Sequence, residues 1–306
     1  MKNIIIGLIL LVLVGAGAFV FLGMNDSFQF TKPEAEEPAT LTVDDDTVEE
    51  EEEPSPFQVV PQGTNPEKTD EVIGTSANGT AIKAYHYGTG DTEILFVGGI
   101  HSAFAPNTVA VMDEFITALK QEAIDIPENL KVTIIPNLNP DASGQPDTLA
   151  SRLNANEVDL NRNFDCDWSA TGVWRSSDVS GGSSAFSEPE AKALRDYVEG
   201  NNIAAAVVYY AADGGVYASN CGGSLDSEIA SLTSTYAEAA GYTANEEFDA
   251  YTISGDATNW MAKIGVPAIG VLLSDYTDSE WTKNMAGIEA VLTEYGDETV
   301  TETDEE

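Results

Sequence analysis

The chain has 306 residues, a formal net charge of −39 and a sequence pI near 4.1. This length is enough for one large α/β domain with appended segments. So strong a negative charge argues against nucleic acid and anionic membrane surfaces as partners, because both would repel it.

The chain starts with a long apolar segment. Lys2 precedes residues 4–24, and about 20 apolar residues are enough to span a bilayer as a helix. The small residues "AGA" at 16–18 are typical of a signal-cleavage site, but the apolar run continues beyond them. We therefore expect residues 1–25 to be an uncleaved, single-pass transmembrane anchor, with the rest of the chain outside the cytoplasm.

Two further segments are too acidic to fold. Residues 26–70 combine runs of Glu and Asp with prolines and few large apolar side chains, which predicts a disordered, self-repelling stalk. Residues 296–306 are expected to be an acidic tail of the same character. The folded domain is accordingly predicted to span residues 71–295.

The chain contains two cysteines, Cys166 and Cys221. Outside the cytoplasm a pair is more often bridged than free, so we expect a disulfide between them. Two buried thiols are the alternative.

Within residues 71–295, short apolar runs alternate with amphipathic segments. The runs at 93–100, 131–139, 204–211 and 268–274 are almost continuously apolar, as in strands buried on both faces. Helices are predicted at 107–123, 187–200, 227–241, 256–265 and 281–295. This alternation predicts an α/β fold with a mainly parallel central sheet flanked by helices.

The loops that leave the carboxyl ends of parallel strands usually hold the ligand site. Here they contain His101, residues 137–141, residues 210–215 and residues 273–275. His101 follows a predicted strand and a glycine pair, an arrangement typical of a metal or catalytic position. His86, the second histidine, is expected to lie in a strand or at the surface.

The stretch "PNLNPDASGQPDTLASRLNANEVDLNRNFDCDW" resembles the zinc metallocarboxypeptidases, the carboxypeptidase A-like peptidases. The motifs "NPD", "SRLNAN" and "VDLNRNF" carry the resemblance, and "YTISGDATNW" and "GVPAIGVLLSDYTDSEW" follow in the family's order. The resemblance covers most of the predicted domain. It implies a mixed, mostly parallel sheet between helices, in agreement with the pattern of apolar runs.

The resemblance implies a set of substrate-binding residues, and this chain retains all of them. An arginine and an Asn-Arg pair hold the terminal carboxylate and the polarised carbonyl, and a tyrosine closes over the substrate. The matching residues here are Arg152, Asn161, Arg162 and Tyr251. Arginine suits this task because its planar guanidinium pairs with a carboxylate through two parallel hydrogen bonds. Structural ion pairs are the alternative role for the two arginines.

The resemblance also implies a catalytic zinc with three protein ligands, and only one of the three matching positions in this sequence carries the expected residue. His101 matches the first histidine, but the glutamate three or four residues later is replaced by Phe104 or Ala105. Tyr210 stands at the second histidine, and Leu272 at the general base. A zinc site needs three donors and an open position for water. His101 is thus interpreted as a remnant of a metal site, with no catalytic residue retained.

These observations predict a membrane-anchored, extracytoplasmic carboxypeptidase-like domain that does not hydrolyse peptides and binds peptide or other carboxylate ligands. No cofactor is expected, and the membrane is contacted through the N-terminal helix. An active zinc carboxypeptidase with substitute ligands is one alternative, and Asp141 and Asp213 are oxygen donors that could hold a hard cation. A cell-surface spacer or interaction module is the other.

Overall fold

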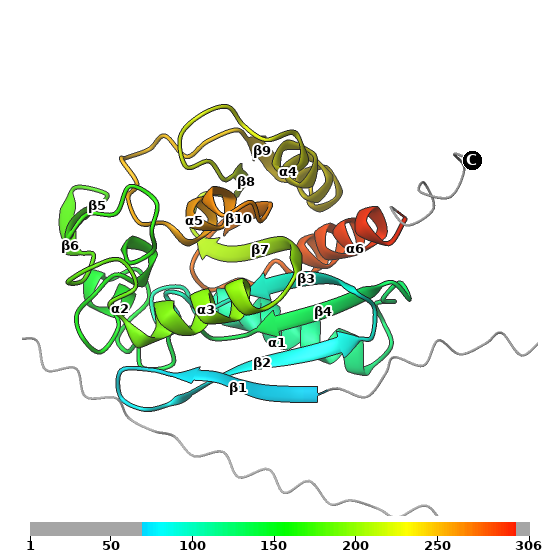
Figure 1. Cartoon of the computed structure of the whole chain (residues 1–306), viewed down its shortest axis with the longest axis horizontal. Coiled ribbons are helices and arrows are strands. Elements are labelled where there is room, and N and C mark those ends of the chain that lie inside the picture. The colour runs from blue at the N-terminus through cyan, green and yellow to red at the C-terminus, as the bar shows by residue number, and fades with distance from the viewer. Residues whose placement is uncertain (1–68, 298–306) are drawn as a thin grey trace, which may run out of the picture. The chain divides into compact units, whose positions relative to one another are not determined.

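An eight-stranded mixed sheet forms the middle of the computed structural model, which describes residues 69–297 (Figure 1). The strand order is β1-β2-β4-β3-β7-β10-β8-β9. The strands are β1 (Thr69–Thr75), β2 (Ala81–Gly88), β3 (Thr92–Val97), β4 (Leu130–Ile135), β7 (Ile203–Ala211), β8 (Gly215–Ala218), β9 (Thr243–Asn245) and β10 (Ala268–Leu273). The inner strands β4, β3, β7 and β10 run parallel to one another. β1 and β2 are antiparallel to their neighbours, and so is β8 to β10, while β9 is parallel to β8.

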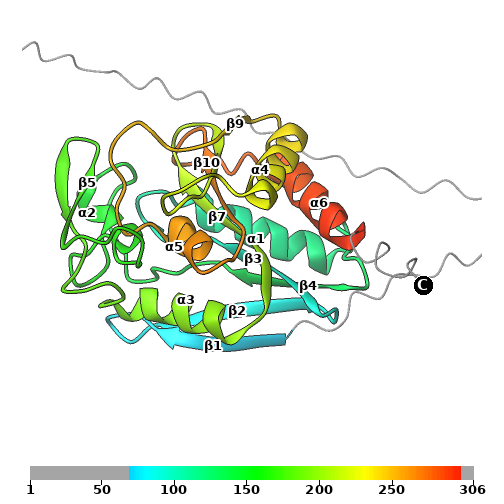
Figure 2. The same cartoon turned by 45° about the horizontal axis from the view of Figure 1, so that its top comes forward.

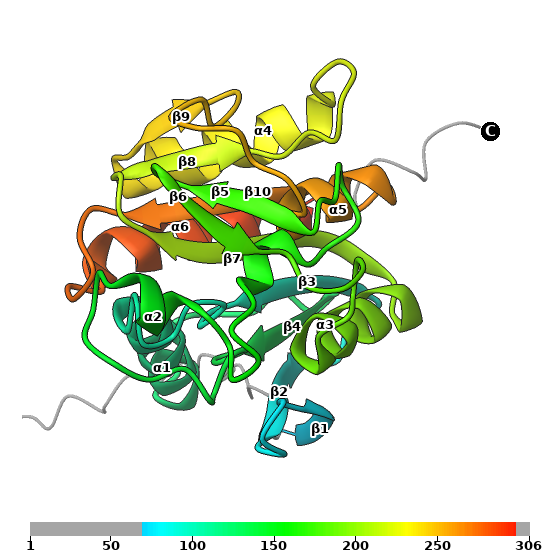
Figure 3. The same ribbon diagram turned by 90° about the vertical axis from the view of Figure 1, so that its left-hand side faces the viewer.

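Helices cover both faces of this sheet (Figures 1 and 3). One face packs against α1 (Asn107–Lys120), α4 (Ser227–Ala240) and α6 (Trp281–Asp297), and Figure 2 shows α4 and α6 side by side. The other face packs against α3 (Pro189–Gly200) and α5 (Ala257–Lys263). Short elements lie in the loops: α2 (Leu149–Arg152), η1 (Leu160–Arg162) and the hairpin of β5 (Thr171–Trp174) and β6 (Ser177–Ser180).

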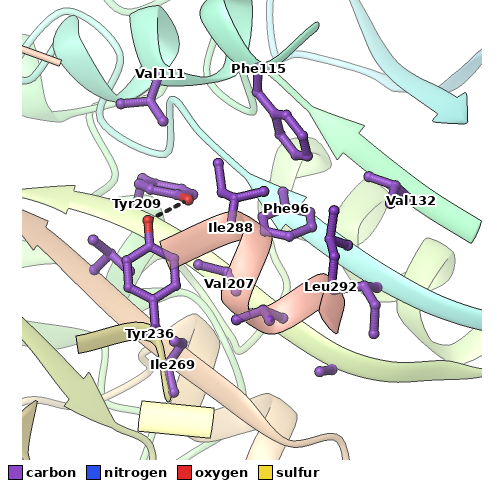
Figure 4. Packing of buried hydrophobic residues seen from close by; sticks show 14 of the residues in the cluster. Phe96, Val111, Phe115, Val132, Val207, Tyr209, Tyr236, Ile269, Ile288 and Leu292 are labelled. Atoms are coloured by element: carbon purple, nitrogen blue, oxygen red, sulfur yellow. Dashed lines mark hydrogen bonds between the residues drawn. The ribbon is translucent and has the colours of Figure 1, made fainter. Parts of the chain in front are cut away.

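The two-sided covering explains why the inner strands are apolar at successive positions. Residues 94–97 of β3 are all fully buried, with alternate side chains in the two cores on opposite faces. In the larger core, Phe96 and Val207 of the sheet meet Phe115 of α1 and Ile288 of α6 (Figure 4). Because both faces of these parallel strands are buried, their sequences are apolar at every position and do not alternate with polar residues.

The predicted architecture is confirmed for the sheet and its helices. All four predicted strands and all five predicted helices are present within residues 69–297. The hairpin of β1 and β2 was not predicted, although Ala77 and Asn78 form its turn and the following Gly79 has φ +86°, a conformation that favours glycine. This hairpin and β8 make the sheet mixed.

The predicted anchor (1–25) lies outside the described residues, as do nearly all of the stalk (26–70) and the tail (296–306). β1 begins at Thr69 and α6 ends at Asp297, so the folded part extends two residues beyond each predicted boundary. Among residues 69–297, no helix is both long and apolar enough to cross a membrane.

The predicted disulfide is confirmed. Cys166 and Cys221 are bonded, with their α-carbons 5.7 Å apart and 55 positions apart in the sequence. Cys166 follows η1 and Cys221 follows β8, so the bond ties the loop that carries "LNRNF" to the far half of the sheet. A crosslink across so long a segment lowers the entropy of the unfolded chain.

We predict that the double substitution Cys166→Ser with Cys221→Ser lowers the free energy of unfolding by about 4 kcal/mol, the chain-entropy value for this loop length. Urea denaturation of the full-length oxidised chain and of the variant measures this difference. The unmodified chain under reducing conditions is the matched control and should behave like the variant. Equal midpoints for the oxidised chain and the variant would show that the bond contributes nothing to stability.

Candidate functional site

Three parallel strands end around one cavity. His101 lies in the loop after β3, Tyr210 near the end of β7, and Leu272 near the end of β10. All three line a cavity of about 390 Å³. The four predicted substrate-binding residues, Arg152, Asn161, Arg162 and Tyr251, line the same cavity. The structure thus brings together residues that are separated by up to 171 positions in the sequence, at the edge of the sheet where ligands are expected.

A fully buried carboxylate, Asp159, contacts three residues that line the cavity. Its Oδ1 atom lies 2.8 Å from Nε2 of His101, and its Oδ2 accepts a hydrogen bond of 2.7 Å from Nε of Arg152. Oδ1 also accepts from the backbone N–H of Asn161 at 3.0 Å, which caps the short helix η1. Asp159 therefore fixes the orientation of three residues of the candidate site.

The protonation states of this cluster follow from burial and from the neighbouring arginine. Burial opposes ionisation of Asp159, but the Arg152 guanidinium and then His101 hold the pKa of that carboxyl far below its usual range. Burial, followed by the positive charge of Arg152, lowers the pKa of His101 to about 4, although Asp159 acts in the opposite direction. At neutral pH the cluster is thus an Arg152–Asp159 ion pair beside a neutral imidazole.

Asn161 connects the cavity wall to the start of α5. Its Nδ2 donates to Oδ2 of Asp256 at 2.6 Å. Its Oδ1 accepts from the Tyr210 hydroxyl and from the backbone N–H of Ala257, both at 3.1 Å. The side-chain amide of Asn161, a predicted substrate-binding residue, has two N–H groups, and one of them is therefore already bonded within the protein.

Arg162 is held in place by backbone carbonyls. Its Nε and NH2 donate to the carbonyl of Val173 at 3.2 and 2.7 Å, and NH1 donates to the carbonyl of Asn161 at 2.7 Å. Its side chain passes close to Gly172, where a Cβ would lie 2.7 Å from Cδ of Arg162. Arg162 is only 1% exposed yet lines the cavity, and it forms no ion pair with any residue between 69 and 297. One N–H on each terminal nitrogen has no acceptor among those residues.

Tyr251 lies beside this guanidinium. The Arg162 carbon Cζ is 5.9 Å from the centroid of the Tyr251 ring, and the ring packs edge-on against Phe248 with centroids 4.9 Å apart. The segment that carries Tyr251 approaches η1 closely at Gly255, where a Cβ would lie 2.3 Å from the Arg162 carbonyl oxygen. An aromatic ring and an unpaired cation thus form one wall of the cavity.

The positions predicted for the family glutamate are occupied by apolar packing. Phe104 is 1% exposed and contacts the rings of Trp174 and Tyr276, with centroids 5.4 and 4.9 Å away. The Arg152 guanidinium carbon lies 5.4 Å from the Phe104 ring. Ala105 is equally buried in the same cluster. Neither residue lines the cavity.

The two acidic residues considered as substitute metal donors serve other bonds. Asp141 accepts from the backbone N–H of Asn78 and from the Thr80 hydroxyl, and so holds the turn between β1 and β2. Asp213 accepts from the Tyr217 hydroxyl. Neither lines the cavity. Their positions therefore do not support the hypothesis that they hold a hard cation at this site.

Comparison with known proteins identifies the fold. The family model described as zinc carboxypeptidase matches residues 62–297. Among solved structures, carboxypeptidase A from Helicoverpa armigera is 20% identical with a TM-score of 0.61, covering 75% of this chain and 67% of that one. Murein-tripeptide amidase MpaA from Escherichia coli O157 is 20% identical with a TM-score of 0.54, covering 73% and 90%. The chain belongs to the zinc carboxypeptidase family, and these structures share its fold.

The family is named after a metal ion, and the residues around this cavity do not fit one. No group of three or more His, Cys, Asp or Glu side chains is placed to hold a metal within the described range 69–297. Burial, and next the Asp256 carboxylate, raise the pKa of Tyr210 well above its usual value, so its phenol stays protonated. Leu272 offers no donor. His101 alone cannot complete the three-donor set that zinc requires.

Two charged residues of the site were not predicted from the sequence. Asp159 lies within the motif "VDLNRNF", two residues before Asn161. Its place in that motif was the signal that could have predicted its contact with His101. Asp256 lies in "YTISGDATNW", and its only signal was the pattern of a helix N-cap. His86, as expected, lies in a strand, where Nδ1 is 2.9 Å from the Thr133 hydroxyl.

We predict a pH dependence of stability that comes from His101. Its folded pKa of about 4 lies below the ordinary 6.5, so between these values the unfolded chain binds a proton that the folded chain does not. Stability should therefore fall as pH decreases from 6.5 to 4, by up to about 3 kcal/mol from this residue. The lowered pKa of Asp159 also contributes to the free energy of unfolding, but this contribution is lost only when the pH falls below the ordinary pKa of a carboxyl group. Urea unfolding across this range, in buffer with a chelator, measures the effect.

The substitution His101→Gln keeps a donor for Asp159 and removes the titrating group, so it should flatten this part of the profile. His86→Gln, at the other histidine, is the control and should leave most of the loss in place. If His101→Gln shows the same loss as the unmodified chain between pH 6.5 and 4, the buried neutral imidazole is not its cause.

Proposed function

We propose that this protein binds ligands with a free carboxylate, such as the C-terminus of a peptide, and does not hydrolyse them. The observation that carries this proposal is the Arg162 guanidinium, which is buried at the cavity wall without a carboxylate partner among the described residues. Burying an unpaired charge is costly, so proteins normally pair it. A ligand carboxylate would supply the missing partner through the two remaining N–H groups.

The other arginine of the cavity has a different role. Arg152 is paired with Asp159 through Nε, and its guanidinium carbon lies between the rings of Phe104 and Trp174, at 5.4 and 5.5 Å from their centroids. The charge of Arg152 is thus neutralised within the protein. We assign it to holding Asp159 and His101 in position, and Arg162 to contacting the ligand.

The absence of hydrolysis is proposed from the residues at the catalytic positions. Peptide hydrolysis in a site of this type needs a base to activate water, and loss of a general base typically costs about 10²- to 10⁴-fold in rate. Here Leu272 stands at that position, and Phe104 and Tyr210 stand where metal donors are expected. An apolar side chain leaves no unpaired charge behind when a metal is lost, which suits a site kept for binding alone.

We further propose that the domain is exposed outside the cytoplasm on a single-pass membrane anchor. The apolar residues 4–24 support the anchor, and the acidic residues after them support a stalk. The Cys166–Cys221 bond adds independent support, because disulfides persist mainly in oxidising compartments. The ligands that reach the cavity would then be extracytoplasmic peptides or peptidoglycan-type carboxylates.

We predict that the purified full-length chain, produced with zinc in the medium, holds no stoichiometric zinc. The reason is the lack of a second and third donor beside His101. Elemental analysis after gel filtration measures the metal content. One zinc per chain that is lost in the variant His101→Gln would support the alternative of an active enzyme with substitute ligands.

We predict that the chain binds a short peptide with a free C-terminal carboxylate and does not bind the same peptide as its amide. A charge-assisted hydrogen bond contributes about 1.5–3 kcal/mol, so Arg162→Gln should weaken binding by roughly tenfold or more. Calorimetric titration of the full-length chain measures both effects. Arg162→Lys keeps the charge and should recover part of the affinity.

Arg195→Gln is the matched control, because Arg195 lies on α3 beside Asp196, and outside the cavity. It makes the same change in net charge and should leave the affinity unchanged. Equal binding of the acid and amide peptides would contradict the proposal. No binding of either peptide would favour a spacer or interaction module.

A further inference from the structure

The turn between β1 and β2 contains the tripeptide Asn78-Gly79-Thr80, which has no part in the proposed carboxylate binding. The pattern Asn-x-Ser or Asn-x-Thr, with any residue except proline in the middle, is the acceptor sequence for N-linked glycosylation of secreted proteins. Within residues 69–297, Asn78 is the only asparagine in this pattern. So short a pattern also arises by chance, and the surroundings of Asn78 therefore decide whether it suits this role.

The tripeptide lies at the exposed tip of the hairpin. All three of its residues are exposed, and a backbone hydrogen bond of 2.9 Å from Gly79 to Ser76 closes the turn. A Cβ on Gly79 would have no neighbour within 4 Å, so the space around the tip is open. β1 is an outermost strand of the sheet, which places the hairpin at its margin (Figure 1). A bulky polar group attached here would extend into solvent.

The hydrogen bonds that hold the turn leave the acceptor atom unused. The backbone N–H of Asn78 donates to Oδ2 of Asp141 at 2.8 Å, and the Thr80 hydroxyl donates to Oδ1 at 2.9 Å. The side-chain amide of Asn78 makes no hydrogen bond with any residue between 69 and 297. Replacing one hydrogen on Nδ2 of Asn78 by a sugar therefore breaks no contact of the folded hairpin.

The turn is also separate from the candidate ligand site. Neither the residues of the turn nor Asp141 line the cavity that contains Arg162. A glycan at the tip is therefore compatible with ligand binding in that cavity.

We propose that Nδ2 of Asn78 carries an N-linked glycan. This inference goes beyond carboxylate binding and rests on one part of the proposed function, the location of the domain outside the cytoplasm. There the chain meets a membrane-bound transferase and its donor, an oligosaccharide carried on a lipid phosphate. The pattern requires the Thr80 hydroxyl, which is bonded to Asp141 in the folded hairpin, so the transfer takes place before the turn docks on Asp141.

The transfer replaces one bond by another at the anomeric carbon of the first sugar. Nδ2 of Asn78 forms a bond to that carbon, while the bond from the carbon to the phosphate oxygen breaks. The lipid phosphate leaves with the electron pair of the broken bond, and Nδ2 loses one proton to solvent. No group is oxidised or reduced.

Mass spectrometry of the full-length chain, isolated from the membranes of the cells that naturally make it, tests this proposal. Trypsin releases residues 69–83, which contain Asn78 and no other acceptor pattern. We expect this peptide to carry the mass of a glycan, and fragmentation to locate that mass on Asn78. The second acceptor pattern of the chain, at 25–27, lies outside the described residues and falls in a different tryptic peptide.

Three substitutions at the tripeptide and one control separate the pattern from its surroundings. Asn78→Gln keeps both bonds to Asp141 and should lose the glycan, and Thr80→Ala should lose it although the asparagine is present. Thr80→Ser keeps the hydroxyl and should retain the glycan. Asn202→Gln is the matched control, because Asn202 is also exposed and stands outside the pattern, so this variant should retain the glycan.

Recovery of residues 69–83 only at their unmodified mass would overturn the proposal, and so would a glycan that persists in Thr80→Ala. Protease added outside the same intact cells separates this failure from a failure of the proposed location. If the protease releases an unmodified domain, the location is supported and the glycosylation proposal alone fails. If the domain is protected and carries no glycan, both proposals fail.

Discussion

The arrangement of the site depends on one buried carboxylate. Asp159 accepts from Arg152 and from the backbone of η1, and it contacts the imidazole of His101. Arg152 beside it holds this buried carboxyl in its charged form, while burial and then the positive charge of Arg152 lower the pKa of His101 and keep its imidazole neutral. His101, Arg152 and the Asn-Arg turn therefore all take their orientation from Asp159.

This dependence explains how the cavity keeps its arrangement with Phe104 and Tyr210 at positions where the family resemblance implies metal donors. Where a donor is expected, Phe104 packs against Trp174 and Tyr276, and Tyr210 donates a hydrogen bond to Asn161. Phe104 is packed against other rings and the Tyr210 hydroxyl is hydrogen-bonded, so neither position holds an unpaired buried charge. The Arg162 guanidinium lines the cavity without a carboxylate partner among the described residues, and the proposed binding chemistry rests on it.

The sequence predicted the inner sheet because those strands are buried on both faces, which leaves a continuous apolar run such as residues 94–97. It did not predict β1 and β2, whose exposed positions break the apolar pattern. In the site, the family motifs located Arg152, Asn161, Arg162 and Tyr251. Asp256 was missed because its bond to Asn161 joins residues 95 positions apart, and no local pattern records such a contact.

The central claim is that this cavity binds a carboxylate ligand and leaves it intact. The most direct measurement is to incubate the full-length chain, supplied with zinc, with N-acetyl-alanyl-lysine and to analyse the bound and free fractions by mass spectrometry. The account predicts that intact peptide is retained by the chain, that Arg162→Gln does not retain it, and that no free lysine accumulates beyond a blank without protein. Release of lysine that requires zinc and is abolished by His101→Gln would contradict it.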